Sequence, residues 1–195
     1  MATGIILAGG KSNRMPGDKA FMEVAGRRVI SIQLEELSGL FDELVIVGNA
    51  ERMASLSEYE AEGVRVIEET VRGKGPLGGI AGGLALSRSD ENFVLACDMP
   101  FVRRAAVEFV LDGLTGHMVC VPETPGGLEP LHAAYRKGCL AVIEARLGAG
   151  ELKVTGFYDD VSVNRIPWEE MERFDPTGRM LINVNSPDDI RARAR

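Results

Sequence analysis

The stretch GIILAGGKSNRMPGDK, residues 4–19, joins a short apolar run to a loop rich in glycine and positive charge. The apolar run predicts a buried strand that ends in glycine. Gly9 and Gly10 allow a tight turn, and successive backbone N–H groups in such a turn form a concave site for anions. Arg14 and Lys19 add charge that suits phosphates, because arginine offers paired donors and lysine a mobile point charge. The stretch therefore predicts the first strand of an α/β fold and a phosphate-binding loop, with an ordinary solvated loop as the alternative.

Composition limits the class of protein. The chain has 195 residues, a formal net charge of −7 and 45% apolar residues, which favours one domain, residues 1–195, with a substantial core. An acidic chain is not typical of a nucleic-acid binder. No apolar run approaches the roughly 20 residues of a membrane span, and no basic leader is visible, so we expect a cytoplasmic protein. The widely spaced Cys97, Cys120 and Cys139 predict reduced core thiols and neither disulfides nor a zinc site.

Short apolar runs alternate with helical patterns over the first 114 residues. This order predicts a doubly wound α/β domain with a mostly parallel sheet covered on both faces, and some antiparallel strands in the C-terminal half. In the first part, strands are predicted over 4–8, 43–47, 64–67 and 93–97, and helices over 28–40, 51–59, 80–87 and 103–114. Farther along, we expect a strand over 132–135, a helix over 137–147, a short strand over 180–182 and a last helix over 187–194.

Polar residues follow several of the predicted strands. In open α/β sheets, ligands bind beyond the carboxyl ends of the strands, so Asn49, Glu69, Asp98 and the loop after the first strand should share one crevice. Asp98 stands out in Cys97-Asp98-Met99-Pro100, because a carboxylate at a strand end suits Mg²⁺, which prefers hard oxygen ligands. A simple turn or cap aspartate is the alternative for Asp98.

A second glycine pattern imitates a dinucleotide-binding fingerprint. Gly73, Gly75 and Gly78 match G-x-G-x-x-G, and Asp98 lies 20 residues beyond the last of them. The placement is poor, since no strand comes immediately before the pattern and Pro76 interrupts it. An NAD-dependent oxidoreductase therefore stays only as a distant alternative.

The segment 183–189, NVNSPDD, precedes the last predicted helix. Ser186 and Pro187 suit a helix start, but capping does not explain two amides on alternate residues, so Asn183 and Asn185 are candidate site residues. His117 is expected at the surface and His132 as a hydrogen-bonded polar residue. No Ser-His-Asp or Cys-His arrangement is indicated.

Taken together, these motifs resemble the molybdenum cofactor guanylyltransferases, which are Rossmann-like nucleotidyltransferases of the nucleotide-diphospho-sugar-transferase type. Leu7-Ala8-Gly9-Gly10, with Arg14-Met15 and Asp18-Lys19, is similar to their signature L-A-G-G-x-x-x-R-M-G-x-D-K. Further similar segments follow in order: Gly75-Pro76-Leu77-Gly78-Gly79, Cys97-Asp98-Met99-Pro100, Glu129-Pro130-Leu131 and Asn183-Val184-Asn185-Ser186-Pro187.

The resemblance implies an enzyme that transfers GMP from GTP to the terminal phosphate of molybdopterin with Mg²⁺ and releases pyrophosphate. A phosphate nucleophile is already largely ionised at neutral pH, so no general base is expected, and catalysis would consist of positioning and charge neutralisation. The implied catalytic residues are Arg14, Lys19 and Asp98, with Asp98 holding the metal. The implied GTP-binding residues are Leu7, Ala8, Gly9, Gly10, Lys19, Asn49, Glu69 and Asp98, and the implied pterin-side residues are Asn183 and Asn185.

The chain departs from the family pattern at three points. Pro16 replaces a glycine, Glu69 stands where an aspartate is common, and the family asparagine aligns with either Gly48 or Asn49. A related transferase that uses CTP or another phosphorylated acceptor, and a non-catalytic nucleotide-binding module, remain alternatives. We expect a monomer that acts on small molecules, with at most transient contact with cofactor-delivery proteins or acceptor molybdoenzymes.

Overall fold

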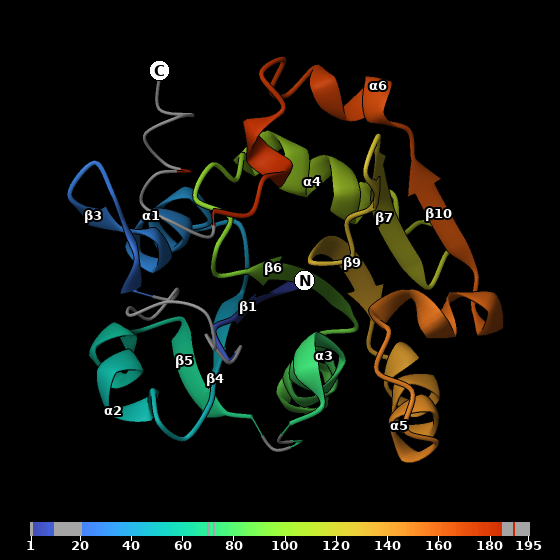
Figure 1. Ribbon diagram of the computed structural model, residues 1–195, viewed down its shortest axis with the longest axis horizontal. Helices are drawn as coiled ribbons and strands as arrows, with labels where there is room; N and C mark the ends of the chain where they lie inside the picture. Colours follow the sequence, from blue (N-terminus) through green and yellow to red (C-terminus); the bar gives the residue numbers. More distant parts are fainter. Residues whose placement is uncertain (1, 10–20, 70, 72, 185–188, 190–195) are drawn as a thin grey trace.

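One sheet runs through the middle of the protein in the computed structural model, which describes residues 2–9, 21–69, 71, 73–184 and 189 (Figure 1). Within these residues the strand order is β10-β7-β9-β6-β1-β4-β5, and β8 pairs with the outer part of β7. The strands are β1 (Ala2–Leu7), β4 (Glu43–Gly48), β5 (Val64–Glu68), β6 (Glu91–Ala96), β7 (Val119–Thr124), β8 (Gly127–Leu128), β9 (His132–Arg136) and β10 (Val163–Ile166).

The sheet is mostly parallel, as predicted. Strand β1 pairs in parallel with β4 and β6, β4 with β5, and β7 with β10. Strand β9 lies between β6 and β7 and runs antiparallel to both. The predicted antiparallel strand in the C-terminal half is therefore confirmed, and it joins the edge pair β7 and β10 to the four strands of the N-terminal half.

Helices cover both faces of the sheet, because the buried strands are apolar on both sides. On β6, Val94 packs into the core beneath α3 and α5, whereas Phe93 and Leu95 pack on the opposite face beneath α4. Figure 1 shows α3 and α5 on one side of the sheet and α1 and α4 on the other. The helices are α1 (Val29–Glu36), α2 (Met53–Leu56), α3 (Gly75–Leu86), α4 (Arg104–Asp112), α5 (Cys139–Gly148) and α6 (Trp168–Glu172). Shorter elements are the hairpin β2 (Glu23–Val24) and β3 (Arg27–Arg28), and the 3₁₀ turns η2 (Ser57–Tyr59), η3 (Val154–Asp160) and η4 (Arg179–Leu181).

Helix α3 begins earlier than the pattern over 80–87 predicted. It starts at Gly75 and includes several glycines, which ordinarily weaken a helix. A Cβ on Gly79 would lie 3.2 Å from the Leu7 side chain, and one on Gly83 would lie 2.6 Å from Ile5 Cγ2. The glycines are therefore needed because α3 packs directly onto β1.

Two further differences concern the C-terminal half. The expected strand over 180–182 is wrong: Met180 and Leu181 lie in the 3₁₀ turn η4, whose start is held by the Met180 N–H donating to the Asp175 carboxylate at 2.8 Å. Strands β7 and β10 were not predicted. The predicted helix over 187–194 lies outside the described residues, apart from position 189.

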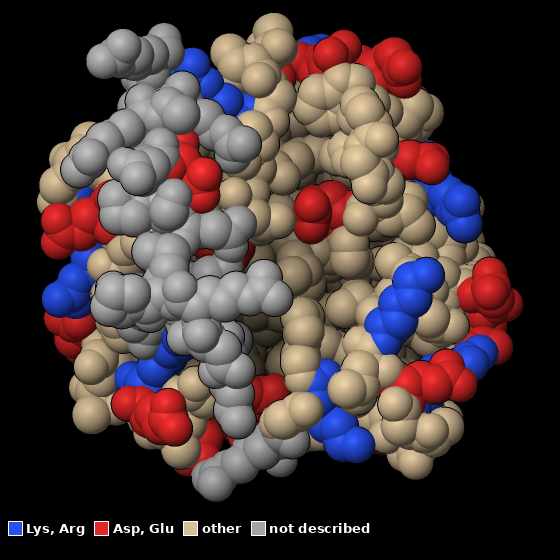
Figure 2. All heavy atoms as spheres, viewed as in Figure 1, with Lys and Arg blue, Asp and Glu red and all other residues tan. Residues whose placement is uncertain are grey.

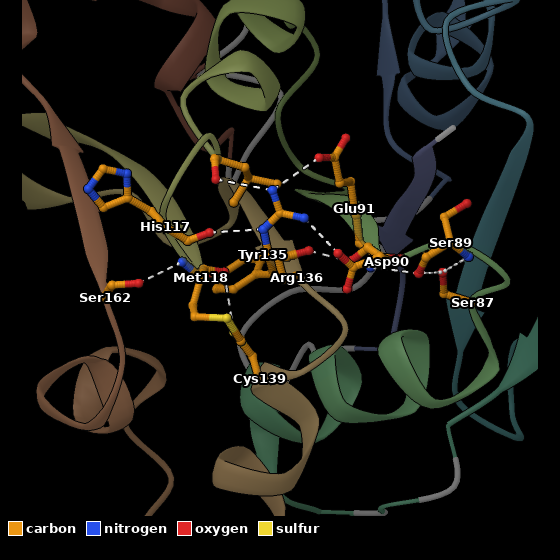
Figure 3. A network of polar contacts seen from close by, with 12 residues as sticks. Ser87, Ser89, Asp90, Glu91, His117, Met118, Tyr135, Arg136, Cys139 and Ser162 are labelled. Atoms are coloured by element: carbon orange, nitrogen blue, oxygen red, sulfur yellow. Dashed lines mark hydrogen bonds and ion pairs between the residues drawn. The ribbon is translucent and has the colours of Figure 1, made fainter.

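A polar network secures the edge of the sheet opposite the carboxyl ends of β1 and β6 (Figure 3). Arg136, at the end of β9, donates to the Asp90 carboxylate at 2.6 Å and to the carbonyl oxygens of His117 and Leu114 at 3.1 and 3.3 Å. It also pairs with Glu91 at 3.3 Å. One guanidinium thus joins β9 to the start of β6 and to the loop that precedes β7.

Cys97, Cys120 and Cys139 are buried thiols with no disulfide between them. Among the described helices, none has the length and apolar character needed to cross a membrane.

Candidate functional site

The carboxyl ends of four neighbouring strands meet at one edge of the sheet. Their order is β6-β1-β4-β5, and the register pairs Leu7 with Ala96 and with Val47, and Gly48 with Glu68. Asp98 follows β6, Ala8 and Gly9 follow β1, Asn49 follows β4, and Glu69 follows β5. The structure therefore brings together the described candidates that the sequence placed in one crevice.

The segment after β1 is held by polar groups from the segment after β4. The Ala8 N–H donates to the Val47 carbonyl oxygen at 2.7 Å, and the Asn49 Nδ2 donates to the Gly9 carbonyl oxygen at 3.2 Å. The Arg52 guanidinium donates to the Ala8 carbonyl oxygen, and the Arg52 N–H donates to Asn49 Oδ1 at 3.1 Å. Asn49 thus positions Gly9, and the buried Arg52, which the sequence did not single out, holds Ala8.

Gly9 leaves room for a neighbouring side chain, which is a different reason for glycine from the one that the sequence suggested. It does not have a positive φ. A Cβ at this position would instead lie 3.1 Å from Glu69 Oε2, and one on Gly78 would lie 3.3 Å from Glu69 Oε1. The Glu69 carboxylate therefore lies between two glycines, and its partial burial raises its pKa.

Asp98 lies in a tight turn at the end of β6. The Met99 N–H donates to the Ala96 carbonyl oxygen at 3.3 Å, which closes the turn around Cys97 and Asp98. The Cys97 N–H donates to the Leu7 carbonyl oxygen at 3.1 Å, so the turn is joined to the end of β1. These two backbone hydrogen bonds hold the backbone of Asp98 in place at the end of β6.

The C-terminal segment reaches the same turn. The Val184 N–H donates to the Asp98 carbonyl oxygen at 2.8 Å, and Val184 is fully buried. Its half-exposed neighbour Asn183 therefore lies beside the Asp98 turn, although the two are far apart in sequence.

A second carboxyl group, Glu129, lies near Asp98. Burial, together with the nearby Asp98 charge, raises the pKa of Glu129 to about 7. The loop that carries Glu129 is held by a buried tyrosine of β9. The Tyr135 hydroxyl donates to the Pro130 carbonyl oxygen at 2.7 Å and lies 2.8 Å from the Tyr158 hydroxyl. Figure 2 shows acidic atoms near the centre of the face in view, with uncharged side chains among the described residues next to them. We did not place Glu129 among the site residues from sequence, although the Glu129-Pro130-Leu131 segment was the available signal.

Four candidates, Gly10, Arg14, Lys19 and Asn185, lie outside the described residues, and so does Pro16. Their predicted roles stay predictions.

The comparisons with known proteins agree with this geometry. A family model described as "MobA-like NTP transferase domain" matches residues 4–161. The chain belongs to this family. It is 36% identical, over 97% of its length and 90% of the relative's, to a protein of Pelotomaculum thermopropionicum named "Probable molybdenum cofactor guanylyltransferase". It is 32% identical, over 95% of its length and 87% of the relative's, to the "Molybdenum cofactor guanylyltransferase" of Syntrophotalea carbinolica.

The fold of this MobA-like NTP transferase is also found among solved structures. Molybdopterin-guanine dinucleotide biosynthesis protein A from Archaeoglobus fulgidus superposes with a TM-score of 0.83 at 25% identity, covering 98% of this chain and 96% of the other.

The donor groups in this MobA-like transferase fit a magnesium ion. Mg²⁺ is typically bound by one or two carboxylates together with substrate phosphates and water. Asp98 and Glu129 form such a pair of carboxyl groups, and the pKa of Glu129 is raised mainly by burial, with the nearby Asp98 charge adding to the effect. Across the described ranges, no group of three or more His, Cys, Asp or Glu side chains could hold a metal by itself.

The glycine pattern 73–78 does not form a dinucleotide-binding site in this transferase. Gly73 and Gly75 have positive φ values of 73° and 64°, and Pro76 lies in the first turn of α3. The pattern is therefore a loop and helix start, separated from β5 by several residues, and not the strand-turn-helix unit of a dinucleotide site.

His132 differs from its prediction. It is fully buried, and neither ring nitrogen has a hydrogen-bond partner among the described residues. Its ring packs edge-on against Phe93, with 5.0 Å between centroids, and burial lowers its pKa to about 4. His117 is half-buried and its ring contacts the Thr115 carbonyl oxygen, so it is not fully at the surface.

Proposed function

We propose that this chain transfers GMP from GTP to the terminal phosphate of molybdopterin, forming molybdopterin guanine dinucleotide and pyrophosphate. One observation carries the proposal: Asp98, the Leu7–Gly9 backbone, Asn49 and Glu69 converge at the carboxyl edge of the sheet, where α/β proteins bind nucleotides. Similarity to proteins named molybdenum cofactor guanylyltransferase over most of the chain supports the choice of nucleotide and acceptor.

The nucleotide side would be formed by the residues that follow β1, β4 and β5. The backbone of Leu7, Ala8, Gly9 and Gly10 would contact the guanine nucleotide, and Asn49 would assist both by contact and by holding the Gly9 carbonyl group. Glu69, which lies between Gly9 and Gly78, would accept hydrogen bonds from the base or ribose. Arg14 and Lys19 would bind and neutralise the triphosphate.

The metal would be held by Asp98, with Glu129 as the neighbouring carboxyl group. Bound Mg²⁺ would neutralise part of the phosphate charge at this point. The chain's own contribution is to orient the two anionic substrates and to exclude water, and it supplies no general base. The fully buried His132 agrees with this chemistry, because its low pKa and its position in the core leave it neutral and away from solvent.

The pterin side would be formed by Asn183 and Asn185. The Val184–Asp98 hydrogen bond supports this assignment, since it fixes the segment next to the turn where the acceptor phosphate must arrive. We further propose that the enzyme works in the cytoplasm as a monomer of one domain, residues 1–195. It would bind no nucleic acid and would meet cofactor-delivery proteins or acceptor molybdoenzymes only transiently.

The direct test uses purified protein, molybdopterin, Mg²⁺ and one of GTP, CTP or ATP, each labelled at the α-phosphate. We expect labelled dinucleotide product and pyrophosphate with GTP, and no product after substitution of Asp98→Ala. Product with CTP alone would overturn the choice of nucleotide. Thermal stabilisation by NAD, without stabilisation by any nucleoside triphosphate, would overturn the transferase assignment.

A further inference from the structure

A glutamine from α1 contacts both ends of the turn that carries Asp98. Gln33 is fully buried, and its Nε2 donates to the carbonyl oxygens of Ala96 at 2.8 Å and of Met99 at 3.0 Å. These two carbonyl groups flank Cys97 and Asp98. A single amide group therefore bridges the turn from the side of α1.

The bridge adds to a turn whose backbone already has few ways to move. The Ala96 carbonyl oxygen accepts from the Met99 N–H as well as from Gln33, and the Asp98 carbonyl oxygen accepts from Val184. The buried amide would hold the turn, and with it the Asp98 side chain, in one orientation, because a shift of the turn breaks the hydrogen bonds from Gln33 to both carbonyl groups.

We propose that Gln33 is a positioning residue, which acts through the Ala96–Met99 turn to aim the Asp98 carboxylate at magnesium and nucleotide. This inference rests on the proposed function, since it needs Asp98 to bind Mg²⁺ and GTP. Gln33 touches neither substrate nor metal, and its effect is expected on geometry alone. Small misplacements of such a group reduce rates by up to about 100-fold.

The chain contains a matched control at the opposite end of β6. Asn92 lies near the start of β6, is fully buried, and donates through Nδ2 to the carbonyl oxygens of Asp90 at 2.9 Å and Ser89 at 3.3 Å. Its Oδ1, like Gln33 Oε1, has no hydrogen-bond partner among the described residues. Gln33 and Asn92 thus share burial and chemistry, and they differ in which end of β6 they hold.

The experiment compares Gln33→Met with Asn92→Leu, each a substitution that replaces the amide side chain by an apolar side chain of similar length. Calorimetry would measure GTP binding with Mg²⁺ and with the metal chelated, and steady-state assays would separate kcat from KM. For Gln33→Met we expect kcat to fall about tenfold or more and Mg²⁺-dependent GTP affinity to fall about fivefold, with metal-free affinity within about twofold. Both variants should lower the denaturation midpoint by a similar amount. Asn92→Leu should leave kcat, KM and the GTP affinity unchanged.

A double-mutant comparison shows whether the effect passes through Asp98. In an Asp98→Asn background, Gln33→Met should cause no further loss of Mg²⁺-dependent GTP binding. A full further loss there, or equal constants for Gln33→Met and Asn92→Leu, would overturn the positioning role. If Gln33→Met does not fold, Gln33→Asn takes its place. The asparagine side chain is shorter, so it can donate to at most one of the two carbonyl oxygens. Wild-type protein that binds no GTP and transfers no GMP would instead remove the proposed function, and the role of Gln33 with it.

Discussion

The Val184 N–H lies 2.8 Å from the Asp98 carbonyl oxygen and donates a hydrogen bond to it. This contact joins the C-terminal segment to the turn at the end of β6, although 86 positions separate the two residues. The segment that carries the proposed pterin-side residue Asn183 is therefore joined by main-chain atoms of Val184 to the turn of the proposed metal ligand Asp98. Substitutions of either side chain can then test the two halves of the site separately.

Asn183→Ala should weaken the acceptor side alone. We expect KM for molybdopterin to rise about tenfold, the loss typical of a hydrogen bond to a charged group, with little change in GTP affinity. Steady-state kinetics would give the first quantity and calorimetry with Mg²⁺ and GTP the second. An equal loss of GTP affinity would show that Asn183 supports the whole turn and does not serve the pterin.

Gly9→Ala should distort the nucleotide loop. The new methyl group would lie 3.1 Å from Glu69 Oε2 and 3.7 Å from the Asn49 N atom, so the loop or the carboxylate must move. We expect GTP affinity to fall about tenfold. The matched control is Gly148→Ala at the end of α5, where a Cβ meets nothing within 4 Å and where alanine should be neutral or slightly stabilising. Equal GTP affinity in the two variants would contradict this explanation of Gly9.

Glu129→Gln should change how stability depends on pH. The pKa of Glu129 is raised from 4.5 to about 7 in the folded protein, so its ionisation opposes folding. Wild-type stability from this group is fully present below pH 4.5 and is lost as pH rises towards 7. Glutamine lacks the charge, so the variant should be the more stable protein at pH 8, and the difference should vanish near pH 4.5. Urea denaturation at a series of pH values measures this, and a pH-independent difference would refute the assigned pKa.

His132→Leu should have the opposite pH signature. Burial lowers the pKa of His132 from 6.5 to about 4, so the folded protein resists protonation that the unfolded chain accepts. This group therefore destabilises the fold as pH falls from 6.5 towards 4. At pH 5 the leucine variant should gain about 2 kcal/mol relative to its difference from wild type at pH 8. The same denaturation series tests it, and an unchanged difference between the two pH values would contradict the prediction.

Arg136→Met should reduce stability without altering catalysis. The substitution removes donors from two backbone carbonyl groups and two carboxylates at the edge away from the candidate site. We expect a loss of about 1–3 kcal/mol in the free energy of unfolding, with kcat and KM unchanged. Arg27→Met is the control, because its ion pair with Glu35 is exposed and should be worth less than about 1 kcal/mol. A kinetic defect in folded Arg136→Met would show that this network reaches the active edge.

Much of the central sheet of this α/β fold could be predicted from the sequence. Strands β1, β4, β5 and β6 are short apolar runs bounded by polar or glycine residues, so hydrophobic patterning alone located them. The start of α3 was missed because glycine disfavours helix locally, while its packing against Leu7 and Ile5 requires glycine. Strands β7 and β10 were missed because Val119–Thr124 and Val163–Ile166 are short and become strands through pairing with distant partners.

The sequence by itself determined the α/β class, the alternation of strands and helices that gives a mostly parallel sheet, and the residue types at the strand ends. These follow from local patterning and from the rule that parallel strands end at one edge. Only the tertiary structure decided that Asn49 and Arg52 hold Gly9 and Ala8 after β1. It also decided that Gln33 bridges the Asp98 turn and that Glu129 and Asn183 lie beside that turn. Each of these contacts joins segments far apart in the chain, and their geometry depends on how α1, β9 and the C-terminal segment pack around the sheet. No periodicity along the sequence encodes that packing.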